Sequence, residues 1–243
     1  MKGVCLGFYE KGEWARPSVL VLMAALNEQE GIGPTLAELK KYVGNSRFLI
    51  VDGRSYDETV HIAKSFDADV VYQRGRGKGE AIAEAIRNVN EDFEYVVLID
   101  ADFTYPAGFI PQMIRILEEN PRLGMVCGNR FCQSLDLRGR TRLLKDMFYF
   151  GNRLLAFTHN LLNGVSLCDP LTGLRVVRWK ILKCWVPKSR GFDIEVELNH
   201  RVEREGFEIA EIPIPYRPRL GKKKLKARHG FQILQRMILE TFY

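Results

Sequence analysis

Short apolar runs alternate with amphipathic stretches through the first half of the chain, and this alternation constrains the fold more than any other feature. The runs lie at residues 18–26, 47–53, 68–74, 95–102 and 123–131. The stretches between them have apolar positions at helical spacing. Continuous apolar strands that alternate with such helices are typical of a parallel sheet covered on both faces. We therefore predict an α/β fold with a mostly parallel central sheet.

The second half predicts longer helices and two further strands. A long amphipathic helix is expected at about residues 140–163, and a turn followed by a strand within 170–182. Residues 192–206 predict a helix that ends at its final glycine, which can adopt the left-handed cap conformation. Residues 207–219 predict a strand in which Pro213 and Pro215 favour the edge of a sheet.

Length and composition fit one domain with a basic C-terminal segment. The 243 residues are within the range of a single core. We divide them into an N-terminal extension (1–17), a main domain (18–220) and a basic, amphipathic C-terminal segment (221–243). The longest apolar run, residues 19–26, is far shorter than the ~20 residues that span a bilayer. The five cysteines show no paired spacing, and we expect a cytoplasmic location.

The positive charge is concentrated in one segment. Of the 36 basic residues, seven lie between 217 and 228 with no acidic residue among them, which leaves 29 against 30 acidic residues elsewhere. A basic segment on an otherwise balanced chain indicates a local anionic partner, such as a phosphate or a membrane surface. It argues against a long nucleic-acid track.

Two acids follow the fourth apolar run, in the sequence VVLIDADFTYP (96–106). Asp100 and Asp102 are two residues apart, so on a strand both would point to the same side, with Cα atoms roughly 6.6 Å apart. The two negative charges repel each other, and Mg²⁺ or Mn²⁺ would offset this. Acids that cap a turn give the same short pattern. The position at the end of a buried parallel strand, where ligands gather, favours the metal site.

Other polar residues follow the neighbouring runs. Asn27 and Glu28 follow the first run and Asp52 follows the second, and together they predict a rim of acceptors for a nucleoside. Each could instead be a turn residue. The stretch RGRGKGEAI (74–82) places cations among glycines at the start of a helix, which predicts an anion site or, with equal weight, a surface turn.

The tail predicts a helix with one apolar stripe. Phe231, Leu234, Ile238 and Phe242 recur at helical spacing beside the basic segment. This arrangement is typical of a helix that lies in a membrane interface. A helix that packs the stripe on its own domain would show the same spacing.

Several motifs occur in a characteristic order. The first-half motifs are ALNE (25–28), VDGRSYDET (51–59), GKGEAI (77–82), DADFTYP (100–106) and GNRF (128–131). DPLTGLRVVR (169–178), a stretch over 191–221 and KKKL (222–225) follow. The ordered set, over residues 18–229, resembles inverting glycosyltransferases of the dolichyl-phosphate mannose synthase type, in glycosyltransferase family 2.

The resemblance implies a glycosyltransferase-A fold and a definite reaction. It implies metal-dependent transfer of a sugar, with inversion, from a nucleotide sugar to dolichyl or polyprenyl phosphate, with Mg²⁺ or Mn²⁺ as cofactor. Mannose from GDP-mannose is the first expectation, and glucose from UDP-glucose the alternative. It also implies a peripheral position at the cytoplasmic face of a membrane, with or without a small membrane-anchoring partner, and no nucleic acid. Transfer to a soluble or polysaccharide hydroxyl stays open, as do a nucleotidyltransferase and a non-catalytic nucleotide-sugar or lipid-binding subunit.

The resemblance also assigns roles to residues. Donor binding is expected of Asn27, Glu28, Asp52, Lys78, Asp100, Ala101 and Asp102, with the metal on Asp100 and Asp102. Acceptor-phosphate binding is expected of Arg130, Arg142, Arg217, Arg219 and Lys224, and direct catalytic roles of Asp102 and Arg130. A phosphate acceptor is already anionic at neutral pH, so no strong general base is required.

Further residues leave the donor undecided. Glu197 matches a helix of the family and could orient a sugar hydroxyl or be a solvated helix acid. Leu26 replaces a common aromatic residue, Gly53 an acid, and Thr104 a glutamine frequent in mannose synthases. Arg54 is also unusual at its position. These departures leave the nucleotide and the sugar open.

Overall fold

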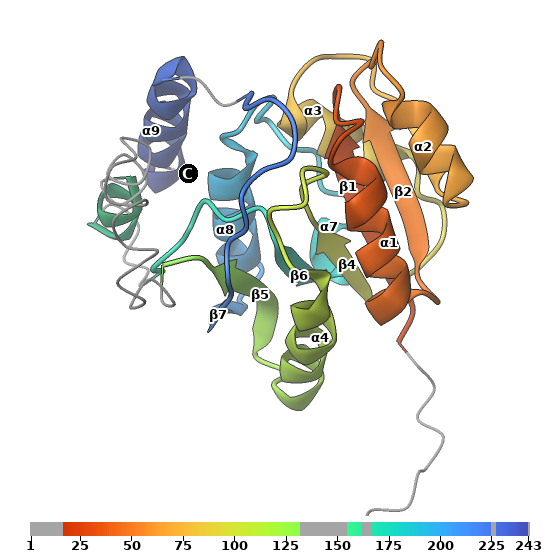
Figure 1. The fold of residues 1–243 in the computed structure, drawn as a ribbon. Coiled ribbons are helices and arrows are strands. Elements are labelled where there is room, and N and C mark those ends of the chain that lie inside the picture. The colour runs from red at the N-terminus through yellow and green to blue at the C-terminus, as the bar shows by residue number, and fades with distance from the viewer. Residues whose placement is uncertain (1–16, 132–154, 162–166, 225–226, 243) are drawn as a thin grey trace, which may run out of the picture.

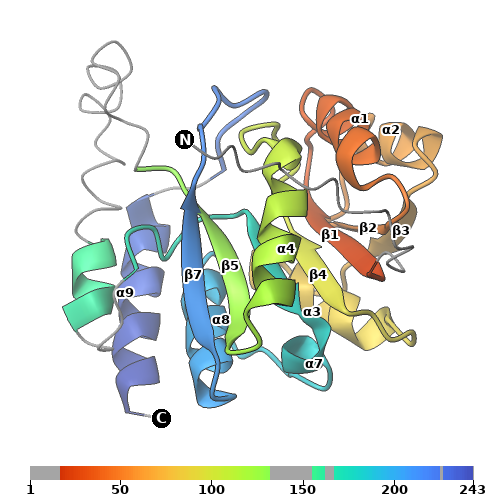
Figure 2. The ribbon, with the colours of Figure 1, turned by 90° about the horizontal axis from the view of Figure 1, so that it is seen from below.

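The structure is a computed structural model that describes residues 17–131, 155–161, 167–224 and 227–242. A seven-stranded sheet lies between two layers of helices (Figures 1 and 2). The strands are Val19–Ala25 (β1), Arg47–Asp52 (β2), Asp69–Tyr72 (β3), Tyr95–Leu98 (β4), Leu123–Asn129 (β5), Arg175–Arg178 (β6) and Glu208–Pro213 (β7). The helices are Ile32–Val43 (α1), Thr59–Ser65 (α2), Lys78–Asn88 (α3), Ile110–Glu119 (α4), Trp179–Leu182 (α7), Ile194–Arg204 (α8) and Ala227–Thr241 (α9), with a 3₁₀ turn at Ala107–Phe109 (η1).

The sheet order is β3-β2-β1-β4-β6-β5-β7. β1 pairs in parallel with β2 and β4, β2 pairs in parallel with β3, and β5 in parallel with β7. Only β6, inserted between β4 and β5, runs antiparallel to its neighbours. The predicted α/β class with a mostly parallel sheet is confirmed. β7, with Pro213 at its end, lies at the sheet edge as its prolines predicted.

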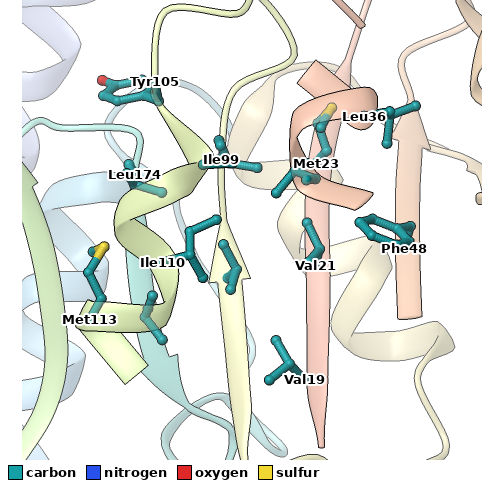
Figure 3. Close-up of a cluster of buried hydrophobic side chains, with 14 of the residues drawn as sticks. Val19, Val21, Met23, Leu36, Phe48, Ile99, Tyr105, Ile110, Met113 and Leu174 are labelled. Carbon is teal, nitrogen blue, oxygen red and sulfur yellow. The ribbon is translucent and has the colours of Figure 1, made fainter. Parts of the chain in front are cut away.

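Alternating side chains of β1 supply the two cores. Val21 and Met23 face α1 and α4, whereas Leu20 and Leu22 face α3 on the other side of the sheet. Figure 3 shows Val21 and Met23 in the first cluster, beside the helices that cover this face. Each of these four side chains is almost fully buried, which stabilises the fold by about 1.5–3 kcal/mol per side chain. The packing fixes the parallel strands so that β1, β2 and β4 end at one edge.

The predicted helix at 140–163 is described only over 155–161, which is helical; the rest of it, including Arg142, lies outside the described residues. The N-terminal extension is also outside them, apart from residue 17.

Helix α9 packs by the face opposite its apolar stripe. Ile233 and Met237 are buried against Val196 of α8. Three of the four stripe residues, Phe231, Ile238 and Phe242, are 72%, 45% and 82% exposed, and Leu234 is half-buried. The alternative in which α9 packs the stripe on its own domain is therefore wrong.

A buried polar network joins β6 to α8. Arg175, 1% exposed, donates hydrogen bonds to the carbonyls of Pro170 (2.6 Å) and Thr172 (2.9 Å) and to Asn199 Oδ1 (2.5 Å). The Asn199 amide lies 3.3 Å from His159 Nε2. Arg175 thereby fixes the turn at residues 170–173, which reappears below as part of the site.

Two buried histidines extend this network. The rings of His159 and His200 lie 5.6 Å apart. Burial lowers the pKa of each to about 4, and for His200 the neighbouring His159 acts in the same direction. Both are therefore neutral in the folded protein at pH 7, with pKa values below the ordinary 6.5.

We expect the folded state to lose stability as the pH falls from about 6.5 towards 4. Below pH 6.5 the unfolded chain binds protons on these histidines while the native protein does not. Between pH 7 and pH 5, His200 alone contributes a loss of up to about 2 kcal/mol. His200→Gln should remove that part of the loss in urea unfolding at the two pH values. His61→Gln, on the exposed side of α2, is the matched control, and an equal loss in both variants would contradict the assignment.

Candidate active site

The acidic pair lies in the turn after β4. The strand ends at Leu98, so strand alternation does not place the two acids, contrary to the sequence interpretation. The turn, in which Phe103 has a φ of 65°, still directs Asp100 and Asp102 into the same cleft. This cleft has a volume of about 520 Å³ and lies at the carboxyl ends of β1, β2 and β4.

Asp100 is held by a lysine and a glycine. Lys78 Nζ, at the start of α3, lies 2.6 Å from Asp100 Oδ1 and 2.7 Å from Glu195 Oε1. Burial acts to raise the pKa of Asp100, but the Lys78 ammonium outweighs it and the pKa is lowered. On the other side, a Cβ added to Gly173 would lie 2.3 Å from Asp100 Oδ2. Asp100 is therefore ionised, with Oδ1 on Lys78 and Oδ2 close to Gly173, and its side chain stays 33% exposed.

Asp102 has a different environment. Its Oδ1 accepts hydrogen bonds from the Thr104 hydroxyl (2.6 Å) and backbone N–H (3.1 Å), and Arg219 lies 3.0 Å from Oδ2. Burial raises the pKa of Asp102, and the negative charge of Asp100 raises it further. Thr104, a departure from the family pattern, thus orients the acid. A carboxylate whose charge is disfavoured in this way suits a divalent cation, whose charge would favour the ionised form.

The expected nucleoside rim divides into two parts. Glu28 lines the cleft, where it contacts Arg219 and Lys224, and burial raises its pKa despite these cations. Asp52 is fully buried and accepts hydrogen bonds from the Ser55 hydroxyl (2.6 Å) and backbone N–H (2.8 Å).

Asn27 acts like Asp52. Its side-chain oxygen accepts from the Tyr56 backbone N–H at 3.0 Å. Asp52 and Asn27 therefore shape the loops around the cleft. Leu26 and Gly53, two of the departures from the family pattern, line the cleft itself.

The glycine-rich loop packs against backbone. Gly77 has a φ of +101°, and a Cβ at Gly79 would lie 2.2 Å from the Ser189 carbonyl oxygen. The Gly79 and Glu80 N–H groups donate to the carbonyls of residues 191 and 190. These two backbone donors in the first turn of α3 are thus taken up within the fold and are not available to an anion. The side chain of Lys78 nevertheless lies in the cleft.

Arg130 lies in a second, smaller cleft of about 120 Å³. Its guanidinium forms two 2.6 Å hydrogen bonds with Asp169 and lies 5.3 Å from the centre of the Tyr216 ring. Burial acts to lower the pKa of Arg130, but Asp169 outweighs it and keeps the group charged. The sequence interpretation gave Asp169 no role, although it begins the DPLTG motif.

The two clefts meet at the acidic pair. Both are lined by Lys78, Asp100, Asp102, Phe192 and Arg219. Arg130 and Tyr105 belong to the smaller cleft only, and Glu28 and Ala101 to the larger. A molecule in each cleft would therefore meet its neighbour beside the two aspartates.

The basic segment after β7 lies along the turn that follows β4. The Leu220 N–H donates to the Asp102 carbonyl at 3.1 Å, and the Arg217 N–H to the Thr104 carbonyl at 3.0 Å. This places Arg219 and Lys224 in the larger cleft. The Arg217 side chain instead pairs with Glu38 of α1 at 2.6 Å and is not among the residues that line either cleft.

The structure places Glu197 away from the site and brings Glu195, to which the sequence analysis gave no role, into it. Glu197 accepts hydrogen bonds from the backbone N–H groups of Lys188 (2.8 Å) and Ser189 (2.6 Å) and lines neither of the two clefts. Glu195 lines the smaller cleft. Residues two apart on a helix point in different directions, so only one of them can face the site.

No group of three or more His, Cys, Asp or Glu side chains suited to a metal occurs among the described residues. A cation at Asp100 and Asp102 would therefore need further ligands from a bound molecule. Mg²⁺ and Mn²⁺ are commonly bound in this way, through one or two carboxylates and substrate phosphates.

Comparison with known proteins agrees with this geometry. Residues 20–185 match the model of glycosyl transferase family 2. A dolichyl-phosphate hexose transferase of Haloferax volcanii is 30% identical over 230 residues, covering 94% of this chain and 96% of that protein. Glycosyltransferase AglJ of the same organism is 32% identical over 204 residues, covering 83% and 64%.

Solved structures agree on the fold. Glucosyl-3-phosphoglycerate synthase of Mycobacterium tuberculosis, in complex with UDP, has a TM-score of 0.72 at 19% identity, covering 96% of this chain and 87% of that one. The same enzyme in complex with Mn²⁺, UDP-glucose and phosphoglyceric acid also has a TM-score of 0.72, at 18% identity and with coverage of 96% and 86%. The chain belongs to glycosyl transferase family 2. It is a glycosyltransferase with the glycosyltransferase-A fold.

We expect Gly173→Ala to displace Asp100 or the turn at 170–173, because the new methyl group would lie 2.3 Å from Asp100 Oδ2 and 3.0 Å from the Tyr105 ring. Overpacking of this kind costs about 1–3 kcal/mol of unfolding free energy, measurable in urea. Gly230→Ala is the matched control, since a Cβ there meets nothing within 4 Å. Equal stability of the two variants would show that Gly173 does not lie as close to Asp100 as the structure has it.

Proposed function

We propose that the protein transfers a hexose from a nucleotide sugar to a polyprenyl or dolichyl phosphate, with inversion and with the help of Mg²⁺ or Mn²⁺. The observation that carries this proposal is the meeting of two clefts at Asp100 and Asp102. The larger cleft has room for a nucleotide sugar, and the smaller holds a charged arginine among aromatic residues. The dolichyl-phosphate hexose transferase of H. volcanii supports a lipid-phosphate acceptor.

The residues of the chain divide the work of transfer. Asp102, with Asp100 beside it, would hold the divalent cation, which when bound supplies positive charge to the leaving diphosphate. Arg219 and Lys224 place further cations in the donor cleft. Arg130, oriented by Asp169, would hold the acceptor phosphate, since guanidinium binds phosphate oxygens in pairs. Alignment of the phosphate oxygen behind the anomeric carbon gives inversion.

We propose GDP-mannose as the donor, following the family resemblance, with UDP-glucose as the alternative. Leu26 and Gly53 line the cleft at positions where the family commonly has an aromatic residue and an acid. Both changes remove groups that could distinguish one base from another.

The donor panel is the direct test of the proposed function. The protein is incubated with GDP- and UDP-hexoses, Mg²⁺ or Mn²⁺, and a short polyprenyl phosphate, and the product is analysed as glycolipid. Transfer from GDP-mannose supports the proposal. Release of nucleotide without lipid labelling would favour a hydroxyl acceptor instead.

Asp102→Ala should lower kcat/KM for transfer by at least about 100-fold, because it removes the acid best placed to hold the cation against the diphosphate. Asp92→Ala, which removes an exposed acid paired with Lys183, is the matched control and should leave transfer unchanged. Full transfer by Asp102→Ala, or by the unaltered protein without divalent metal, would exclude this assignment.

We propose that the protein reaches its lipid acceptor at a membrane surface through α9. No helix in the described ranges is long and apolar enough to cross a bilayer. The exposed stripe of α9 lies next to the basic segment, and the helical residues 155–161, which lie beside α9 in Figures 1 and 2, also expose Phe157 (65%) and Leu161 (71%). Apolar residues beside basic ones suit an anionic lipid interface.

The double substitution Phe231→Ser and Phe242→Ser should weaken binding to phosphatidylcholine vesicles that contain phosphatidylglycerol. These rings are 72% and 82% exposed, so their loss leaves the fold intact. Each buried ring contributes about 1.5–3 kcal/mol, and we expect the vesicle-bound fraction in sedimentation to fall at least about tenfold. Tyr72→Ser, an exposed ring on β3 at the opposite edge of the sheet, is the control. Equal binding by all three proteins would exclude α9 as the contact.

A further inference from the structure

One acid in the smaller cleft has no place in the chemistry described so far. Glu195 lies in the first turn of α8 and is 7% exposed. Its Oε1 lies 2.7 Å from Lys78 Nζ, and the same ammonium lies 2.6 Å from Asp100. Lys78 therefore links Glu195 directly to Asp100, one of the two acids at which the clefts meet.

The second oxygen of Glu195 has no partner. Oε2 is buried and forms no hydrogen bond with any group in the described part of the chain. A buried acceptor left unpaired costs about 1–3 kcal/mol, more when it is charged, and such groups in native proteins call for an explanation. A hydroxyl donor from a bound molecule would satisfy it.

The position of Glu195 indicates which molecule this would be. Transfer requires the anomeric carbon to lie between the leaving diphosphate and the acceptor phosphate, so the hexose must lie where the two clefts join. Lys78 and Asp100 line both clefts at this junction, and Glu195 lines the smaller cleft next to Lys78. The hydroxyls of a hexose are donors of the kind that Oε2 lacks.

A role as general base is not needed here. An acceptor phosphate is anionic at neutral pH, so no proton has to be removed. The contact with Lys78 also holds the Glu195 carboxylate in one position, where it can accept a hydrogen bond.

Accordingly, we propose that Glu195 accepts a hydrogen bond from one hydroxyl of the donor hexose and thereby contributes to the choice of sugar. This inference rests on the proposed function, since it requires a hexose at the junction. Glu197, two residues further along α8, cannot take this role because its carboxylate is occupied by two backbone N–H groups. A site that hydrogen-bonds a substrate hydroxyl rejects analogues that lack it more strongly than an apolar pocket can.

The test combines Glu195→Gln with donor analogues. The donor that proves active in the panel above is compared with its 2-, 3-, 4- and 6-deoxy forms, in the unaltered protein and in the variant. In the unaltered protein, loss of the hydroxyl that Glu195 binds should lower kcat/KM by about 10–100-fold, as expected for a hydrogen bond to a charged group. In Glu195→Gln the same analogue should lose much less relative to the full sugar.

This interaction between variant and analogue separates substrate contact from a structural role. If Glu195 only held Lys78 in place, the substitution and the missing hydroxyl would act independently. Each deoxy sugar would then lower kcat/KM by the same factor in the variant as in the unaltered protein. Because each comparison is a ratio within one protein preparation, partial unfolding of the variant cancels. Glu205→Gln, at the C-terminal end of α8, is the control and should show the discrimination of the unaltered protein.

Two outcomes would overturn the inference, and only the second would also overturn the proposed function. Independent losses at every hydroxyl, with the unaltered protein transferring hexose, would exclude Glu195 as the contact while leaving the proposed function intact. Absence of transfer by the unaltered protein from any donor would remove the proposed function and the inference with it. If the variant transfers too slowly to measure, calorimetric binding of the full and deoxy donors gives the same comparison.

Discussion

The site depends on one shared cation. The Lys78 ammonium, at the start of α3, joins the turn after β4 through Asp100 to helix α8 through Glu195. These elements come from distant parts of the sequence, and burial of the lysine would be costly without both acids. The glycine-rich loop packs closely against the backbone of residues 189–191, and this contact positions Lys78 between the two acids. One close backbone contact thus determines where the acidic pair can lie.

The charges of the larger cleft favour a ligand that carries both signs of charge. The larger cleft contains acids and bases in direct contact, with Arg219 between Glu28 and Asp102 and Lys224 on Glu28. Burial still raises the pKa of Glu28 and of Asp102. A cleft whose acids are only partly compensated favours additional positive charge, while its arginine and lysine favour a phosphate. A metal–diphosphate unit offers both charges together.

Much of this was accessible from the sequence because it depends on local pattern. Apolar runs located the strands, the glycine at 206 ended α8, and the ordered motifs identified the family. The antiparallel direction of β6 could not be predicted, because an apolar run looks the same in a parallel and in an antiparallel strand. Nor was the division between Glu195 and Glu197, or the turn of Arg217 towards Glu38, because each depends on a partner distant in sequence. Asp169 had a signal in its motif, but its partner Arg130 lies 39 residues away.

Helix α9 has two distinct surfaces. Its N-terminal residues His229, Gln232 and Ile233 contribute walls to the clefts, and its outer stripe is bare. Both surfaces belong to one helix, so a force that tilts α9 from its outer side also moves the residues that line the clefts. A substitution on the outer surface that shifts the helix would therefore also change the shape of the two clefts.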